Sequence, residues 1–364
     1  SGGSGGGGGG DSGDGRAGGS SGGGGSDGSS GGGGVDKRPA SELSPAEGDR
    51  TGKRPGTGAA TASERVVCIG DVHGNLSELR TLWKGLTRRL GEDALRAATC
   101  IFLGDYCDRG PDTKGVLEWL IKLAERRAPC STRFLAGNHD FGLAAFVGAL
   151  PGVGPAFNLD ETQQPHYTSG FWPHAVPGGM HYQGRRWAEG HVYNSAATFA
   201  SYDVSFVDVG AAGSEGLRDA LRAALPESHL TFIQNLDWVV DKTYPWGRLV
   251  AVHAGLQTEQ PLRPQLDALA RRDLADPALF SDGDRGRLAP LCDRRTVRGM
   301  HPELAAASPT AVLVSGHHGF ADIGTERVIL DASGGRPGPG QPLQALILPE
   351  RCVLGSDGSV RTFG

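Results

Sequence analysis

A carboxylate and an imidazole stand two residues apart in the stretch Gly-Asp-Val-His-Gly-Asn at positions 70–75. The stretch directly follows the apolar residues 66–69, so Asp71 and His73 lie on the loop leaving an expected strand, and both can face one cation. Glycines on either side let the backbone turn sharply there. Alone the pattern is weak, because Asp and Gly also build ordinary turns. Four later stretches repeat its design.

Side chains of metal-binding type follow five expected strands in all. They are Asp71 and His73, Asp105 and Asp108, Asn138 and His139, His253, and His317 with His318. Carboxylates, imidazoles and an amide oxygen, with no thiolate among them, suit a pair of divalent Mn, Fe or Zn ions better than a structural zinc. A single histidine after a strand is more often a turn residue, but five coincident strand ends predict a dinuclear metal site.

Such a site is compatible with phosphoryl transfer. Two cations about 3.5 to 4 Å apart can hold a bridging hydroxide at neutral pH and neutralise the charge of an in-line displacement at phosphorus. This chemistry requires no covalent phosphoenzyme. Cys107 lies between Asp105 and Asp108, but nothing resembling the phosphate-cradling loop of a cysteine phosphatase follows it, and we expect Cys107 to be a packing residue.

Three strand-helix units are expected to position the first of these residues. The strands are expected at residues 66–69, 99–103 and 133–136, and each runs into one of the polar stretches. The helices are expected over residues 76–90, 116–124 and 141–150. Strands alternating with helices predict an α/β fold with parallel strand pairs, whose loops gather at one edge, where α/β proteins bind ligands.

The second half of the chain adds further helices and strands. Helices are expected near residues 217–225 and 226–236, and strands at 249–252, 311–314, 328–330 and 343–348. The last three strands lie close together without long helices between them, which predicts a mixed or antiparallel sheet. Residues 151–212 are rich in Gly, Pro, His and aromatic side chains with little periodicity, and we interpret them as a functional insertion.

Composition divides the 364 residues unequally. Residues 1–62 are so rich in Gly, Ser and other polar residues that they cannot offset the entropy of ordering, and we expect them to be a disordered extension. Residues 63–364 are long enough for one large catalytic domain. Since residue 1 is not Met, we expect the sequence to begin inside a longer chain, so an upstream targeting signal would not be visible.

The net charge and the cysteine pattern limit the partners and the compartment that we expect for this protein. The formal net charge is -5 and no Lys/Arg-rich block stands out, so we expect no nucleic-acid partner, and no apolar run is long enough to expect a membrane span. The six cysteines contain no CxxC pair, which favours reduced core thiols in a cytoplasmic or nuclear protein. The sequence does not determine the oligomeric state.

The polar stretches read GDVHGN, GDYCDRGP, GNHD, VHAGL and GHH, in this order from residue 70 to residue 318. This series resembles the calcineurin-like metallophosphoesterases, and the DRG of the second motif resembles their phosphoprotein phosphatase branch. More narrowly, the sequence is similar to the plant and algal Rhizobiales-like phosphatases. The resemblance implies a central β-sandwich of mixed sheets flanked by helices, and hydrolysis of phosphorylated proteins or peptides, with phosphotyrosine preferred.

The resemblance also implies roles for individual residues. Asp71 and His73 would hold the first of two divalent metal ions, Asp105 would bridge both, and Asn138, His253 and His317 would complete the second. Arg109 would clamp two phosphate oxygens, and His139, oriented by Asp108, would protonate the leaving oxygen. His318 stands one residue away from the second histidine of the family's GHxH motif, and it either helps bind the phosphate or contacts backbone or solvent.

The sequence says less about the substrate than about the metal ligands. A tyrosyl leaving group has a pKa of about 10, well below that of an alkyl alcohol, so it depends less on a general acid. In the insertion, Arg185 and Arg186 are either further phosphate donors or a solvated pair. The insertion's aromatic side chains either bind substrate or pack it down; they are His166, Tyr167, Trp172, His174, His181, Tyr182 and Trp187.

Two departures from the broader family keep alternatives open. GNHD replaces GNHE, and VHAG replaces the HGG of the serine/threonine phosphatases. VHAG also occurs in diadenosine polyphosphate hydrolases. A serine/threonine phosphatase and a diadenosine polyphosphate hydrolase on the same metal site therefore remain alternatives. A phosphopeptide-binding module without catalysis is disfavoured, because every matched ligand is intact.

Overall fold

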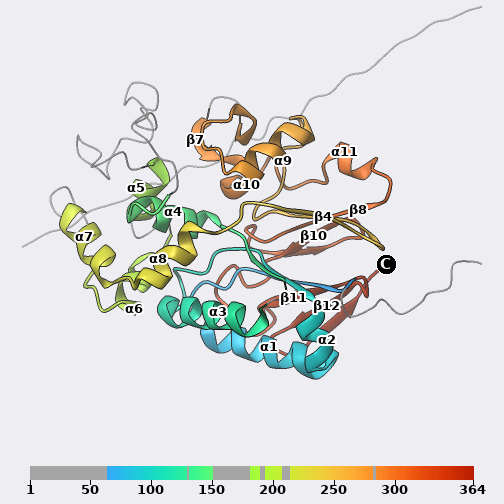
Figure 1. The fold of residues 1–364 in the computed structure, drawn as a ribbon, viewed down its shortest axis with the longest axis horizontal. Helices are drawn as coiled ribbons and strands as arrows, with labels where there is room; N and C mark the ends of the chain where they lie inside the picture. Colours follow the sequence, from blue (N-terminus) through green and yellow to red (C-terminus); the bar gives the residue numbers. More distant parts are fainter. Residues whose placement is uncertain (1–63, 129–130, 151–180, 189–192, 207–213, 282–283) are drawn as a thin grey trace, which may run out of the picture. The chain divides into compact units, whose positions relative to one another are not determined.

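A computed structural model describes residues 64–128, 131–150, 181–188, 193–206, 214–281 and 284–364 (Figure 1). The expected disordered extension, residues 1–62, lies outside these ranges, as does most of the expected insertion over 151–212. Residues 58–364 form one compact unit.

Three parallel strands open the first sheet, as the sequence predicts. They are β1 (Val66–Ile69), β2 (Thr99–Phe102) and β3 (Thr132–Phe134). The sheet continues beyond β1 with antiparallel strands β11 (Gln344–Leu348), β12 (Cys352–Gly355) and β13 (Val360–Thr362), so its order is β13-β12-β11-β1-β2-β3. Every residue of β1 and β2 is buried, as expected for strands covered on both faces.

The second sheet has the order β4-β5-β8-β10-β9. Its strands are β4 (Val240–Tyr244), β5 (Gly247–Ala251), β8 (Ala311–Ser315), β9 (Ala321–Ile323) and β10 (Arg327–Leu330). The inner three strands run parallel, and the two edge strands are antiparallel to them. A small third sheet pairs β6 (Phe280–Ser281) with β7 (Asp284–Leu288).

The two large sheets pack face to face. Side chains from β1 and β2, among them Val66, Cys68 and Ile101, meet Leu249 and Val314 of the second sheet in one buried cluster. Helices α1 (Leu76–Leu90), α2 (Glu92–Ala97) and α3 (Thr113–Arg127) cover the outer face of the first sheet, and α9 (Leu262–Arg271), α10 (Ala289–Cys292) and α11 (Pro302–Ala305) lie beyond the second (Figure 1). The architecture is the expected β-sandwich of mixed sheets flanked by helices.

The prediction for the last three strands is partly wrong. The strands β8 and β10 pair with each other in parallel, but β11 belongs to the other sheet, where it runs antiparallel to β1. Residues 331–343 cross from one sheet to the other, so closeness in sequence does not become pairing here. The strands β4, β9, β12 and β13 were not predicted.

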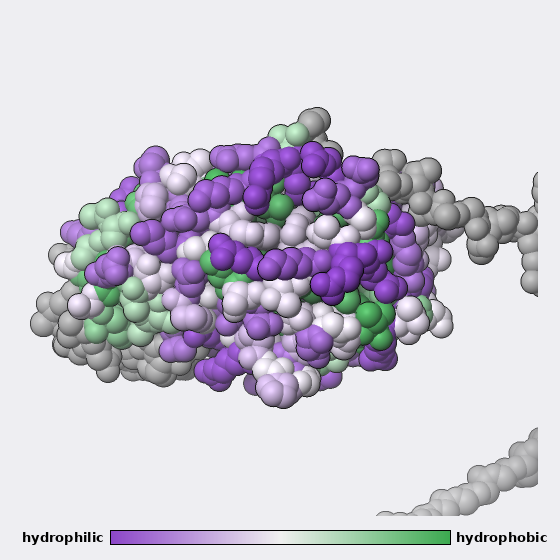
Figure 2. Space-filling model, turned by 90° about the horizontal axis from the view of Figure 1, so that it is seen from below, coloured by the Kyte–Doolittle hydropathy of each residue, from purple (hydrophilic) through white to green (hydrophobic). Residues whose placement is uncertain are grey.

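Two long helices match the prediction closely. Helix α1 (Leu76–Leu90) buries Leu79, Leu82 and Leu86 and ends before Gly91. Helix α3 (Thr113–Arg127) begins after Asp112, whose Oδ1 accepts the N–H of Gly115 and caps the helix. Their outer faces are hydrophilic, and the face seen from below Figure 1 shows only scattered hydrophobic patches (Figure 2).

Helix α4 (Asn138–Phe146) begins three residues earlier than predicted, so Asn138 and His139 lie in its first turn. The other helices are α2 (Glu92–Ala97), α5 (Tyr182–Ala188), α6 (Ala196–Ser201), α7 (Ser214–Ala224), α8 (Glu227–Gln234), α9 (Leu262–Arg271), α10 (Ala289–Cys292) and α11 (Pro302–Ala305). None of the helices in the described ranges is long and apolar enough to cross a membrane.

Most of the cysteines that the structure describes are buried. Cys68, Cys107 and Cys352 are buried free thiols, Cys100 is buried, and Cys292 is partly exposed. Cys130 lies outside the described residues. Cys107 packs inside the core as expected.

Candidate metal centre and active site

The ends of β1 and β2 bring the first ligand candidates together, because the two strands are parallel neighbours. The loops that follow are joined by backbone hydrogen bonds: Val72 N and His73 N both donate to Asp105 O. His73 and Asp105 have φ angles of 48° and 54°, in the left-handed region that non-glycine residues rarely adopt. The paired loops hold both residues in this conformation and turn their side chains toward one point.

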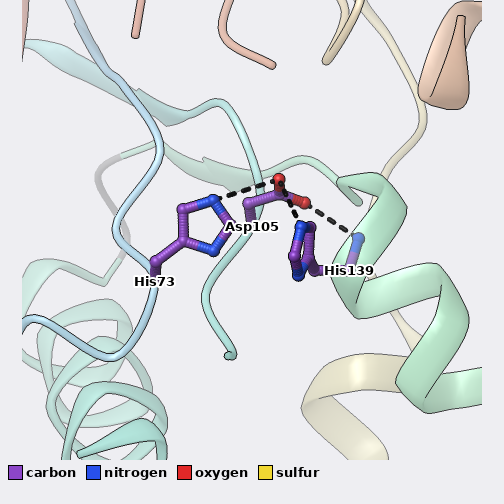
Figure 3. A group of neighbouring side chains, drawn as sticks. All are labelled: His73, Asp105 and His139. Carbon is purple, nitrogen blue, oxygen red and sulfur yellow. Dashed lines mark hydrogen bonds and ion pairs between the residues drawn. The ribbon is translucent and has the colours of Figure 1, made fainter. Parts of the chain in front are cut away.

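One group of possible ligands consists of His73, Asp105 and His139 (Figure 3). Their donor atoms all lie within 4.8 Å of one another, and all three residues are buried. His73 Nε2 lies 3.4 Å and His139 Nε2 3.9 Å from Asp105 Oδ2. The backbone N–H of His139 donates to Asp105 Oδ1 at 3.0 Å, so the first turn of α4 also fixes the carboxylate.

A second group consists of Asp105, His253 and His317. His253 Nε2 lies 3.4 Å from Asp105 Oδ2. The amide oxygen of Asn138 points between the two histidines, 3.2 Å from His253 Nε2 and 2.8 Å from His317 Nδ1. Asp105 is the residue common to both groups, the position that the sequence analysis predicted for a bridging ligand.

The donor atoms fit divalent cations. His73 Nδ1 contacts Cys107 O at 2.9 Å and His253 Nδ1 contacts Leu103 O at 2.8 Å, so each ring is fixed with Nε2 toward Asp105. His317 Nε2 is buried and has no hydrogen-bond partner among the described residues. Buried polar atoms of this kind are satisfied when they bind a cation.

Asp71 lies beside these groups rather than inside them. Its Oδ2 accepts the N–H of His317 at 2.9 Å, and its Oδ1 lies 4.0 Å from His253 Nδ1. Asp71 Oδ1 is buried without a hydrogen-bond partner among the described residues. Burial and the nearby carboxylate of Asp331 raise the pKa of Asp71 well above its ordinary value. A cation beside these two carboxylates would relieve the repulsion.

Sequence reasoning missed Asp331. This carboxylate is buried, accepts the N–H of Gly319 through Oδ2, and leaves Oδ1 without a partner among the described residues. It directly follows β10, within the expected strand-end pattern, but the stretch Asp331–Ala332–Ser333 matches none of the motif strings. Its position after a strand was the available signal.

Electrostatics keep most of these histidines neutral. Burial lowers the pKa of His73 and His317 well below the ordinary value. Burial also tends to lower the pKa of His253, but the carboxylates of Asp105 and Asp71 outweigh it and raise the pKa to about 10. For Asp105, burial opposes ionisation, yet His253 and His139 hold its pKa well below the usual range. Neutral imidazole and ionised carboxylate are the forms that bind metals.

Asp108 and His139 form a buried pair, with 2.7 Å between Asp108 Oδ2 and His139 Nδ1. Burial raises the pKa of Asp108 to about 8 and lowers that of His139 to about 3. Near neutral pH the pair therefore holds one titratable proton in addition to the N–H of a neutral imidazole. The other ring nitrogen, His139 Nε2, faces Arg109.

Arg109 spans the two histidines nearest to it. Its Nη1 donates to His73 Nε2 at 3.0 Å and to Gly334 O at 2.7 Å, while its Nη2 donates to His139 Nε2 at 3.1 Å. A guanidinium held by a backbone carbonyl in this way presents a planar, permanently charged surface. This geometry suits the predicted clamp on phosphate oxygens.

The remaining predicted residues have different placements. Arg186 lies with its guanidinium carbon 5.7 Å from the ring centroid of Tyr193, whose ring packs against His139 at 4.7 Å. The side chain of Arg185 lies outside the described part of α5. His318 is buried with Nε2 2.8 Å from Ala254 O. Of its two predicted alternatives, it therefore has the backbone contact and not the contact with the phosphate.

One side chain of the insertion lies in the protein interior and contacts the candidate site from there. Trp187 of α5 is fully buried, and its Nε1 donates to Asp108 Oδ2 at 2.7 Å. Of the two alternatives for the aromatic side chains of the insertion, Trp187 therefore takes the packing one, because its indole lies behind the Asp108–His139 pair. Residues 151–180, 189–192 and 207–212 of the insertion lie outside the described residues, and with them His166, Tyr167, Trp172 and His174.

Comparison with known proteins gives one family match. Residues 64–210 match the calcineurin-like phosphoesterase family. The matched segment contains nine of the candidate residues: Asp71, His73, Asp105, Asp108, Arg109, Asn138, His139, Arg185 and Arg186. A symmetrical bis(5'-nucleosyl)-tetraphosphatase of Ralstonia nicotianae is 37% identical over 93 residues, which cover 26% of this chain and 29% of that protein. The chain thus spans less than a third of this curated relative.

Similar solved structures include enzymes of two different kinds. A putative diadenosine tetraphosphatase shares 18% identity with a TM-score of 0.40, over 82% of this chain and 91% of that one. A cold-active protein-tyrosine phosphatase of a psychrophilic Shewanella species shares 15% identity with a TM-score of 0.46, over 88% of this chain and 89% of that one.

Proposed function

We propose that this chain, which carries a calcineurin-like metallophosphoesterase domain, hydrolyses phosphomonoesters with two divalent metal ions and prefers phosphotyrosine in proteins or peptides. One observation carries the proposal. Asp105 is shared by two buried groups of metal-type ligands, and the guanidinium of Arg109 lies against both histidines of the first group, His73 and His139.

Asp71, His73 and Asp105 would hold one ion, and Asp105, Asn138, His253 and His317 the other. When bound, the two cations would supply positive charge to the phosphate oxygens and lower the pKa of a bound water. The mixed nitrogen and oxygen donors suit Mn, Fe or Zn.

The protein's own groups would orient the phosphate and move the proton. Arg109 would bind two phosphate oxygens through its planar guanidinium, giving up its contacts to the histidines. His139 would carry a proton at Nε2 and give it to the leaving oxygen, and the carboxylate of Asp108 on Nδ1 would stabilise the imidazolium. A phosphate dianion beside Nε2 favours that proton location over the one on Asp108.

Phosphotyrosine preference rests on chemistry and on the sequence resemblance. A tyrosyl oxygen with a pKa of about 10 requires less protonation than an alkyl oxygen. It can therefore leave even when the general acid, His139, is buried and rarely protonated. Arg186 lies beside Tyr193, next to His139, where a phosphopeptide could meet it. We propose the same role in phosphopeptide binding for Arg185, because it is the neighbour of Arg186 in α5.

A second candidate is hydrolysis of a dinucleoside polyphosphate. The 37% identity over 93 residues to a symmetrical bis(5'-nucleosyl)-tetraphosphatase favours it. Such a substrate would use the same metal ligands, since both reactions transfer a phosphoryl group in line. Hydrolysis of phosphoserine or phosphothreonine is the third possibility on this site.

A substrate comparison tests the proposal. The full chain, supplied with Mn, is assayed with matched phosphotyrosine, phosphoserine and phosphothreonine peptides and with diadenosine tetraphosphate. We expect the highest kcat/KM for phosphotyrosine, loss of turnover with EDTA, and the same loss in Asp105→Asn. Faster turnover of diadenosine tetraphosphate would select the second candidate, and turnover that survives EDTA would contradict the metal-dependent reaction.

A further inference from the structure

The carboxylate of Asp108 has three side-chain partners, although it is fully buried. Its Oδ2 lies 2.7 Å from His139 Nδ1 and also accepts the indole N–H of Trp187 at 2.7 Å. Its Oδ1 accepts the hydroxyl of Thr198 at 2.6 Å. Two of the three partners, Trp187 on α5 and Thr198 on α6, belong to the segment that interrupts the sequence of motifs.

The same segment also holds the backbone of the motif. Asp108 and Arg109 adopt φ angles of 70° and 61°, a left-handed conformation that is unfavourable for both residue types. The backbone N–H of Asp108 donates to Thr198 Oγ1 at 2.9 Å, and that of Arg109 donates to Asn194 O at 3.3 Å. Residues 194–198 therefore stabilise the turn that aims both side chains.

Trp187 and Thr198 are themselves firmly placed. The indole of Trp187 is fully buried between the rings of Phe146 and Phe199, at centroid distances of 5.3 Å each. Helix α6 is joined to the start of α3, because Lys114 N donates to Ser201 Oγ at 2.8 Å. Neither donor can follow Asp108 if the carboxylate rotates, so together they fix its orientation.

We propose that Trp187 and Thr198 are positioning residues for the phosphoester hydrolysis, and that they act on His139 through Asp108. This inference rests on the proposed function. In that reaction the ester P–O bond breaks as water forms a new P–O bond. The leaving oxygen takes the proton from His139 Nε2, and a proton of the attacking water replaces it. Asp108 must face Nδ1 throughout, and Trp187 and Thr198 hold it there.

A role through the general acid makes a specific prediction about leaving groups. The leaving oxygen of phenyl phosphate has a pKa of about 10 and still gains from protonation, whereas 2,4-dinitrophenyl phosphate releases a stable anion without a proton. Loss of a residue that acts only on His139 should therefore slow the first ester much more than the second. A residue with a purely structural role would slow both alike.

The experiment measures kcat on both esters for the Mn-loaded full chain and for Trp187→Phe, Thr198→Val and Thr198→Ser. We expect Trp187→Phe and Thr198→Val each to lower kcat on phenyl phosphate about 10-fold, as a fraction of a general acid's contribution, and on the dinitrophenyl ester less than about 2-fold. Thr198→Ser keeps the hydroxyl and should restore most of the loss. Bound Mn, measured by mass spectrometry, should be unchanged.

Two controls sharpen the assignment. Tyr202→Phe removes another buried hydroxyl of this segment, one that contacts His229 and not Asp108, and it should leave both rates unchanged. In an Asp108→Ala background, Trp187→Phe should cause no further loss on phenyl phosphate, because the residue through which it acts is gone.

The outcomes separate this inference from the proposed function. Equal losses on both esters, or full additivity with Asp108→Ala, would overturn the positioning role and leave the phosphoesterase proposal intact. Failure of the wild-type chain to hydrolyse either ester would overturn both. If Trp187→Phe does not fold, the Thr198→Val and Thr198→Ser pair decides, since the first substitution exchanges the hydroxyl for a methyl group and the second removes only the methyl group.

Discussion

The carboxylate of Asp140 holds the backbone of the residue that both ligand groups share: Asp140 Oδ2 lies 2.6 Å from Asp105 N. The same carboxylate accepts the N–H groups of Gly137 and Tyr106 at 3.0 and 2.8 Å. The first turn of α4 is thereby joined to the loop that follows β2. Asp140 contacts no reacting group, but it fixes the position of Asp105.

Asp140→Ala would leave three buried N–H groups without an acceptor. Each costs about 1–3 kcal/mol, so we expect the free energy of unfolding to fall by about 3 kcal/mol or more and Mn affinity to fall with it. Asp140→Asn retains one acceptor oxygen and should lose less of both. Urea denaturation and Mn titration calorimetry measure the two quantities, and an Asp140→Ala protein with normal Mn affinity would contradict this arrangement.

Metal content should follow the two ligand groups. We expect about two equivalents of Mn in the wild-type chain, about one in His317→Ala, and severe loss in Asp105→Asn, which removes a carboxylate oxygen from both groups. Removal of metal with EDTA should lower the melting temperature, and Mn should restore it, because bound ligand stabilises the folded state.

His318→Gln provides the matched control for metal content. This residue neighbours His317 but directs its Nε2 to Ala254 O, so the substitution should keep two equivalents. Elemental analysis of the purified variants checks both substitutions, and loss of an ion from His318→Gln would place that histidine in the metal site.

Arg109→Lys tests the planar guanidinium. Lysine keeps the positive charge but cannot contact His73, His139 and Gly334 O at once, as Arg109 does. We expect kcat/KM to fall about 10- to 100-fold with metal content unchanged. Arg88→Lys, at an exposed position on α1, should have no effect. Steady-state kinetics with a phosphotyrosine peptide gives the comparison, and equal rates for both variants would exclude the clamp.

Arg127 supports the fold far from the site. Its Nη1 and Nη2 donate to Leu95 O and Ala98 O at 2.7 and 2.6 Å, and its Nε donates to Thr132 Oγ1. Arg127→Met should lower the free energy of unfolding by about 3 kcal/mol, because buried carbonyls lose their donors.

The exposed neighbour Arg126 offers the control for Arg127. Among the described residues, its guanidinium donates to the backbone oxygen of Lys122 in its own helix and to no other group, so Arg126→Met should change the free energy of unfolding by less than about 0.5 kcal/mol. Urea denaturation of both variants makes the comparison. Similar losses in the free energy of unfolding would show that the buried hydrogen bonds of Arg127 do not stabilise the fold.

His229 should make stability depend on pH. It is buried with Nδ1 2.7 Å from the hydroxyl of Tyr202, and burial lowers its pKa below the ordinary value. The unfolded chain therefore binds more protons at this residue below about pH 6.5, so its contribution to stability is complete above that pH and is lost as the pH falls toward 5.

His229→Gln isolates this contribution from that of the other buried histidines. The free energy of unfolding of the variant should decline less steeply between pH 7 and pH 5 than that of the wild type. Urea denaturation at several pH values measures the two slopes, and parallel slopes would show that His229 titrates alike in both states.

The sequence by itself determined the local elements and the types of side chain at the strand ends. Apolar periodicity set α1 and α3 to within a few residues, and the polar stretches after β1 and β2 supplied the ligands that the structure brings together. These features depend on neighbours a few residues away, and the propensities of those neighbours are readable directly.

Only the tertiary structure decided how distant segments meet. Trp187 and Thr198 reach Asp108 from 79 and 90 positions further along the chain, and β11 joins β1 rather than the strands that precede it. No local pattern encodes such contacts, because they form only when whole sheets and helices pack. The buried Asp331 likewise becomes a candidate site residue only because the packing of the two sheets places it near Asp71.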